Sequence, residues 1–122
     1  MKVFVVEDSA VIRERLKRLL AEMPEVQVVG ETGDAQLALA AILEQRPDVV
    51  LLDIHILNGN GIDVLQRLKQ ERVAPAVIIL TDYPYPEYRQ VCLDAGADFF
   101  LVKSTDFEQI VPALQKLNQQ KA

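Results

Sequence analysis

The chain turns from apolar to acidic twice in the same way, first in Val3-Phe4-Val5-Val6-Glu7-Asp8 and then in Val49-Val50-Leu51-Leu52-Asp53. Two later apolar runs also end at a polar residue: residues 77–80 before Thr81 and residues 99–102 before Lys103. Short runs of β-branched and aliphatic residues are typical of strands buried on both faces of a parallel sheet. Parallel strands present their carboxyl ends on one edge, where open α/β folds bind ligands. The sequence therefore predicts one crevice that holds three carboxylates, a hydroxyl and an ammonium group.

The three carboxylates belong to Glu7, Asp8 and Asp53. Like charges that share a crevice repel one another unless a cation lies between them. Carboxylate oxygens are also the ligands that hard divalent cations prefer. The three residues therefore predict a site for a divalent metal ion.

Five apolar runs alternate with amphipathic helical patterns along the chain. The runs lie at residues 3–6, 26–29, 49–52, 77–80 and 99–102. This alternation predicts an α/β fold, a five-stranded parallel sheet with helices on both faces. For five strands we expect the flavodoxin-like order 2-1-3-4-5, whose switch point lies between the first and third strands. The acidic residues end those two strands, so they fall at the switch point.

Capping residues, prolines and glycines give approximate helix boundaries. The predicted helices start after Asp8 or Ser9 and end by Pro24, start at Asp34 and end by Pro47, follow Gly59-Asn60-Gly61, span about 86–95, and span about 105–118. Pro112 lies inside the last helix, where it removes a hydrogen bond and clashes with the carbonyl of Glu108. We therefore expect a kink or a loosened first turn there.

The composition predicts a single cytoplasmic domain over residues 1–122. Half of the 122 residues are hydrophobic, and the net charge of −5 argues against direct binding to nucleic acid, which needs a basic face. The sequence shows neither a signal peptide nor a run long enough to span a membrane, so we expect no membrane association. Cys92 is the only cysteine, which excludes an intramolecular disulfide and predicts a buried thiol.

The order and spacing of the polar residues resemble those of the receiver domains of two-component response regulators. The resemblance covers essentially the whole chain. The matching residues are Glu7-Asp8, Asp53, Gly61, Thr81 and Lys103. Each match is a weak signal alone, but five matches in order at the family's spacing are specific.

The resemblance implies that Asp53 accepts a phosphoryl group and becomes an aspartyl-phosphate. It also implies that Mg²⁺ is the metal, held by Glu7, Asp8, Asp53 and the backbone carbonyl of His55. Mg²⁺ keeps several waters, so a few protein oxygens suffice. The His55 side chain would flank the phosphoryl site.

Three further roles follow from the same resemblance. Lys103 would pair with Asp53 before the reaction and with a phosphoryl oxygen after it, neutralising charge. Thr81 would donate its hydroxyl to a phosphoryl oxygen. Phe100 resembles the family's switch aromatic, and because it lacks a hydroxyl it can report the state only by packing.

Several positions depart from the family's pattern. Leu57 and Ser104 stand where proline is usual, and Asp82 stands where alanine or glycine is usual. The loop Tyr83-Pro84-Tyr85-Pro86 is unusually stiff and aromatic. We expect the Asp82 carboxylate near the mouth of the phosphoryl site, because Thr81 just before it faces the phosphate.

The predicted function is that of a phosphoacceptor whose donor is a histidine kinase or a histidine phosphotransfer protein, with an unknown output protein as its target. Such a protein is an enzyme only in catalysing its own phosphorylation and dephosphorylation. One alternative is a pseudo-receiver, which binds partners without carrying phosphate. A flavin-binding electron carrier of the same strand order would need a phosphate-binding loop where Glu7-Asp8 stand. An aspartate-nucleophile phosphatase would need a second acid at the position of His55.

Overall fold

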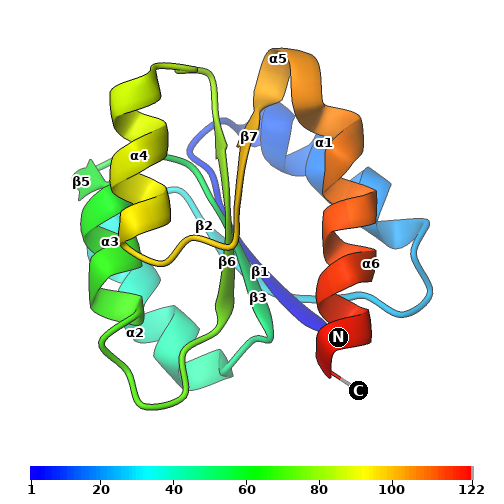
Figure 1. The fold of residues 1–122 in the computed structure, drawn as a ribbon. Coiled ribbons are helices and arrows are strands. Elements are labelled where there is room, and N and C mark those ends of the chain that lie inside the picture. The colour runs from blue at the N-terminus through cyan, green and yellow to red at the C-terminus, as the bar shows by residue number, and fades with distance from the viewer. Residues whose placement is uncertain (122) are drawn as a thin grey trace.

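The computed structural model describes residues 1–121 as alternating strands and helices (Figure 1). The strands are β1 (Lys2–Val6), β2 (Gln27–Thr32), β3 (Val49–Leu52), β4 (His55–Ile56), β5 (Gly59–Asn60), β6 (Ala76–Thr81) and β7 (Phe99–Val102). The helices are α1 (Ala10–Ala21), α2 (Ala35–Gln45), α3 (Gly61–Leu68), α4 (Pro86–Asp94), α5 (Lys103–Asp106) and α6 (Ile110–Lys121), with a 3₁₀ turn, η1 (Phe107–Gln109), before α6. Among these residues, no helix has the length and apolar character that crossing a membrane requires.

Five of the strands form one parallel sheet in the order β2-β1-β3-β6-β7. Counted among themselves, these strands have the order 2-1-3-4-5, so the predicted flavodoxin-like topology is confirmed. The register pairs Val6 with Leu52 across β1 and β3. The next residues, Glu7 and Asp53, therefore leave the sheet side by side at the switch point.

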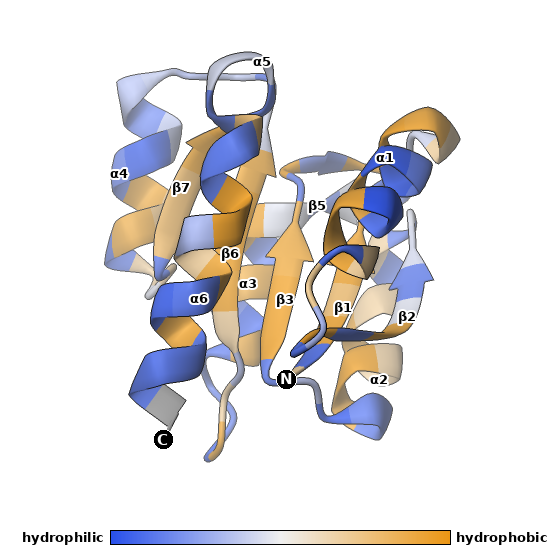
Figure 2. Cartoon of the chain, turned by 90° about the vertical axis from the view of Figure 1, so that its right-hand side faces the viewer, coloured by the Kyte–Doolittle hydropathy of each residue, from blue (hydrophilic) through white to orange (hydrophobic). Residues whose placement is uncertain are grey.

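Helices cover both faces of the sheet, with α2, α3 and α4 on one face and α1 and α6 on the other (Figure 1). Because alternate strand residues point to opposite faces, each strand supplies both layers of the core. In β1, Phe4 and Val6 pack in the layer of α2 and α3, while Val3 and Val5 pack in the layer of α1 and α6. Figure 2 shows the hydrophobic strands enclosed by helices, of which α4 and α6 mix hydrophilic and hydrophobic residues while α2 is mainly hydrophobic.

Local chemistry explains where the helices start. Ser9 begins α1, Asp34 begins α2 and Asn60 begins α3, and each side chain accepts a hydrogen bond from a backbone N–H in the first turn. Pro86 occupies the first turn of α4, where its missing N–H costs nothing. Of the two caps expected for the first helix, Ser9 is the one used. The Asp8 carboxylate is therefore not committed to capping α1.

The C-terminal segment differs from the single helix expected over 105–118. It begins earlier, at Lys103, and is divided into α5, η1 and α6. Pro112 lies in the first turn of α6, and in a continuous α-helix its ring would clash with the carbonyl of Glu108. The chain takes the tighter 3₁₀ turn at that point. The loosened turn predicted from Pro112 is confirmed.

Two details were not predicted. β4 and β5 form an antiparallel hairpin between β3 and α3, with Asn58 in the left-handed region at φ 59°. A two-residue pairing has too few residues to leave an apolar pattern in the sequence. β2 extends to Thr32 instead of ending at Val29. Its last residues, Gly30, Glu31 and Thr32, pair with β1 through their backbones but are not apolar, so the apolar pattern did not reveal them.

Cys92 is fully buried, as predicted, and burial raises the pKa of its thiol from about 9 to about 11. Between these values the unfolded chain loses a proton that the folded chain keeps, so stability falls as the pH rises. We expect urea unfolding to show this loss in the wild type above pH 9, by at most about 1.4 kcal/mol per pH unit. Cys92→Ala should lack this component. Parallel stability curves for the two proteins from pH 7 to 10.5 would contradict it.

Candidate functional site

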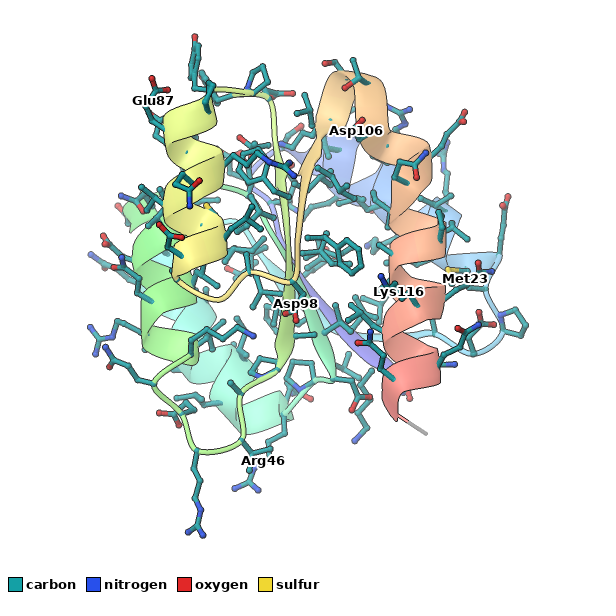
Figure 3. The ribbon with its side chains drawn as sticks, in the orientation of Figure 1. Met23, Arg46, Glu87, Asp98, Asp106 and Lys116 are labelled. Atoms are coloured by element: carbon teal, nitrogen blue, oxygen red, sulfur yellow. The ribbon has the colours of Figure 1, made fainter. Side chains whose placement is uncertain are left out.

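The carboxyl ends of the central strands bring polar side chains into an otherwise apolar interior. The buried ones are Glu7, Asp53, Thr81 and Lys103. Asp8, next to the first of them, is exposed at the edge of the crevice. In Figure 3, Glu87 at the start of α4 and Asp106 in α5 mark this end of the molecule. The structure thus brings together the residues that the sequence placed in one crevice.

The carboxylates of Glu7, Asp8 and Asp53 form a cluster that fits a divalent cation. One oxygen from each lies within 4.8 Å of the other two. Asp53 Oδ1 is buried and has no hydrogen-bond partner among the described residues. A buried carboxylate oxygen in that state is costly, and a cation removes the cost. The donor set is therefore that of a site for a hard cation such as Mg²⁺.

Lys103 is a cation that the chain itself supplies to this cluster. Its Nζ donates a hydrogen bond to Asp53 Oδ2 at 2.7 Å and forms an ion pair with Glu7 Oε1. The pair with Glu7 Oε1 is ionic contact without hydrogen-bond geometry. Both partners of the lysine are almost fully enclosed, so these charges interact with little screening by water.

The pKa values follow from burial and pairing. Burial raises the pKa of Glu7 and of Asp53, and the contact of each carboxylate with the Lys103 ammonium opposes that rise. Burial opposes the charge on Lys103, but its contacts with the carboxylates of Asp53 and Glu7 raise its pKa nevertheless. The ammonium therefore stays charged, and it faces more acidic groups than it can neutralise.

Backbone contacts hold the acidic residues in place. Ser9 N–H donates to Glu7 Oε2 at 3.0 Å, and Arg13 Nη1 donates to the Glu7 carbonyl at 2.7 Å. Gly61 begins α3 against the carbonyl of Asp53, where a Cβ would lie 2.0 Å from the oxygen. Gly61 is therefore required by close packing against the chain at Asp53.

Lys103 directly follows the last residue of β7 and is the first residue of α5. Asp106 Oδ2 accepts a hydrogen bond from Val102 N–H at 2.9 Å, which closes the short helix on itself. Ser104, where receivers usually have proline, lies inside this helix. Asp106 is thus a supporting residue that the sequence analysis missed, because a side chain that caps a strand end leaves no pattern.

Ring contacts connect the loop after β6 to the hairpin after β3. Tyr83 N–H donates to Thr81 Oγ1 at 3.2 Å, and the Tyr83 ring packs on His55 with centroids 4.1 Å apart. The contacts continue through Tyr85 and Tyr88 at 5.9–6.2 Å. The sequence indicated a stiff aromatic loop, but His55 as its partner lies far away in the chain.

Two other predicted residues lie near the crevice. Phe100 points inward, 7% exposed in the core, with the Arg89 guanidinium 5.9 Å from its ring centroid. Asp82 Oδ2 lies 4.0 Å from Lys103 Nζ while 66% of its side chain is exposed. The expected position of Asp82 at the mouth of the crevice is therefore confirmed.

Comparison with known proteins agrees with this geometry. The profile of the response regulator receiver domain matches residues 3–115. The chain belongs to the receiver family. The response regulator domain of Thermotoga maritima CheB matches this receiver with a TM-score of 0.85 and 31% identity, covering 98% of this chain and 94% of that one. A LuxR-family DNA-binding response regulator from Staphylococcus aureus gives a TM-score of 0.89 at 25% identity, covering 96% and 98%.

The curated relatives are longer proteins. The sensory transduction protein LytT of Bacillus cereus is 35% identical over 121 residues, which are 99% of this chain and 48% of LytT. The DNA-binding transcriptional activator DevR/DosR of Mycobacterium tuberculosis is 36% identical over 115 residues, covering 94% of this chain and 53% of that protein. The receiver spans about half the length of the curated relatives it matches.

Membership of the family settles the class of the protein. It is a receiver domain of the two-component response regulators. Receiver domains bind Mg²⁺ at an acidic pocket, interact with histidine kinases and output domains, and are generally not classical enzymes. The electron-carrier and phosphatase alternatives are therefore set aside.

We expect Mg²⁺ to stabilise the wild type, by about 1.4 kcal/mol at ten times Kd. Asp8→Asn should raise stability in EDTA, because it removes one of three crowded negative charges without burying a new polar group. The same change should reduce the gain from Mg²⁺. Melting temperatures in EDTA and in millimolar Mg²⁺ test both effects. Glu44→Gln removes an exposed carboxylate of α2 outside the cluster and serves as the control. An equal response to Mg²⁺ in Asp8→Asn and wild type would argue against the metal site.

Proposed function

We propose that the 122 residues act as one phosphoacceptor receiver in which Asp53 takes a phosphoryl group from a phosphohistidine. The donor is a histidine kinase or a histidine phosphotransfer protein, and the phosphorylated state changes binding to an output protein. The observation that carries the proposal is the state of the Asp53 carboxylate: Oδ2 is held by Lys103 at 2.7 Å, while Oδ1 is buried without a hydrogen-bond partner among the described residues.

The transfer needs one bond formed and one broken. Asp53 Oδ1 attacks phosphorus in line, the phosphorus–nitrogen bond of the donor breaks, and its electron pair returns to the imidazole. Lys103 Nζ stays within reach of the oxygens that gain charge, and the Thr81 hydroxyl donates to one of them. Water later hydrolyses the acyl phosphate and restores the carboxylate.

The acidic cluster provides the metal ligands for this reaction. The carboxylates of Glu7, Asp8 and Asp53 and the backbone carbonyl of His55 would hold Mg²⁺, directly or through water. When bound, the ion neutralises negative charge on the phosphoryl oxygens. Because Glu7 already pairs with Lys103, its role extends to keeping the lysine charged and in place.

Phosphorylation would act on a two-state equilibrium. Thr81 and Phe100 are the residues that change position, and Phe100 now lies inward against α4. A ligand or modification shifts such an equilibrium only by its differential interaction with the two states. The new bonds from Thr81 and Lys103 to the phosphoryl group supply that difference, and the face of α4, β7 and the C-terminal helix α6 carries it to the partner.

We expect wild-type protein to gain one phosphoryl group from acetyl phosphate when Mg²⁺ is present and none in EDTA. Asp53→Asn should gain none, because an amide is not a nucleophile toward phosphorus. Asp63→Asn, an exposed change in α3, is the matched control and should be labelled like wild type. Intact-mass measurement detects an added phosphoryl group in each of the three proteins. Labelling of Asp53→Asn would assign the phosphoryl group elsewhere, and a wild type that accepts no phosphoryl group would indicate a phosphate-independent interaction module.

Asp82 should slow phosphorylation by small anionic donors. At roughly 7 Å in water, one extra negative charge costs an anion about 0.6 kcal/mol, or a two- to threefold change in rate. Asp82→Asn and Asp82→Ala should both be labelled faster than wild type, with a smaller difference at high salt because charges are screened. Time courses of phosphorylation, quenched at intervals and recorded at two ionic strengths, measure these rates. If Asn behaves like wild type and only Ala is faster, the obstacle is the size of the side chain and not its charge.

A further inference from the structure

The loop between β2 and α2 packs directly on the acidic pair. A Cβ at Gly33 would lie 2.6 Å from Asp8 Cα and 3.1 Å from the carbonyl oxygen of Glu7. Just before it, Thr32 O accepts a hydrogen bond from Glu7 N–H at 2.9 Å. The backbone at residues 32–33 therefore supports Glu7 and Asp8 through close packing and a hydrogen bond.

The same loop is hydrogen-bonded to the β4–β5 hairpin on its other side. Leu57 N–H donates to Gly33 O at 2.9 Å, and Ala35 N–H donates to Leu57 O at 2.8 Å. Asp34 and Leu57 thus form a parallel bridge. A proline at position 57 could not make the first of these bonds, because it has no N–H. The hairpin starts at His55. The loop at residues 33–34 therefore contacts both the Glu7-Asp8 pair and the hairpin that carries the His55 carbonyl.

One side-chain pair closes this connection. Asn58 Nδ2 donates to Asp34 Oδ2 at 2.6 Å, and Asp34 Oδ1 accepts the N–H groups of Gln36 and Leu37 at the start of α2. The bond from Asn58 lowers the pKa of Asp34, so the acceptor is charged and the bond is strengthened. Neither residue ends an apolar strand, and for that reason the sequence analysis selected Asp34 only as a helix cap and did not select Asn58.

We propose that this pair, the Asp34–Asn58 clasp, positions the metal site. The clasp fixes the hairpin, and with it the His55 carbonyl, relative to the support of Glu7 and Asp8. Mg²⁺ demands near-octahedral geometry at about 2.1 Å and tolerates small ligand shifts poorly. Loosening the hairpin therefore weakens the ion's binding without changing any ligand. The inference rests on the part of the proposed function in which the acidic cluster binds Mg²⁺.

Two substitutions break the clasp and preserve the local backbone. Asn58→Gly keeps the left-handed conformation, and Asp34→Ser keeps a cap for α2. Isothermal titration calorimetry at fixed ionic strength should show Mg²⁺ binding weakened about two- to tenfold in each, the equivalent of one hydrogen bond. The double variant should bind as a single variant does, because both remove the same interaction. Gln90→Ala removes an exposed bond of similar length, Gln90 Nε2 to Asp94 Oδ1 at 2.7 Å, and should bind Mg²⁺ like wild type.

The outcomes separate the clasp from the metal site itself. A wild type that binds no Mg²⁺ would overturn the metal site and the clasp together. Wild-type binding with unchanged affinity in Asn58→Gly and Asp34→Ser would overturn the clasp alone. Urea unfolding in EDTA is the second readout, and a loss of stability in these variants with unchanged Mg²⁺ affinity would show a bond that only supports the fold.

Discussion

One ammonium group, that of Lys103, allows two carboxylates to be buried side by side in this protein. Glu7 and Asp53 come from neighbouring strands and are almost completely enclosed, and each contacts Lys103 Nζ. Burying either carboxylate alone would cost several kcal/mol, and a cation in contact offsets much of that cost. Asp8 adds a third carboxylate to this cluster, and one ammonium cannot neutralise three negative charges. The negative charge that remains is the property that makes the crevice a site for a cation.

The acidic neighbours of Lys103 differ in their exposure to water. Its contacts with Asp53 and Glu7 are enclosed, whereas Asp82 approaches to 4.0 Å from the exposed side. An exposed ion pair contributes little because water and salt screen it. Asp82 therefore does not compete strongly for the lysine in the resting fold. Its charge acts on what enters the crevice and leaves the buried pairs intact.

The parts of the site that the sequence predicted are those attached to strong local patterns. Asp53 and Lys103 each end an apolar run, and one edge of a parallel sheet gathers such residues whatever the details of the loops. The clasp could not be predicted, since Asp34 and Asn58 are 24 residues apart and meet through two loops without apolar periodicity. The early start of α5 at Lys103 depends on Asp106 bonding back to Val102 N–H, which is again a contact between side chain and backbone. The effect of Pro112, in contrast, could be predicted from the sequence, because the clash of its ring acts within one turn of the chain.

The hairpin of β4 and β5 is the element at which these connections meet. It is bonded to the β2–α2 loop through Leu57 and Asn58, and His55 packs on Tyr83. The Thr81 hydroxyl has one proton to donate and two lone pairs to accept with, so it can donate to a phosphoryl oxygen while still accepting from Tyr83 N–H. In the proposed switch, a move of Thr81 toward the phosphoryl group would therefore carry Tyr83 with it instead of releasing it. Since Tyr83 packs on His55, the same move would reach the hairpin, and the Asn58–Asp34 bond links the hairpin to the start of α2.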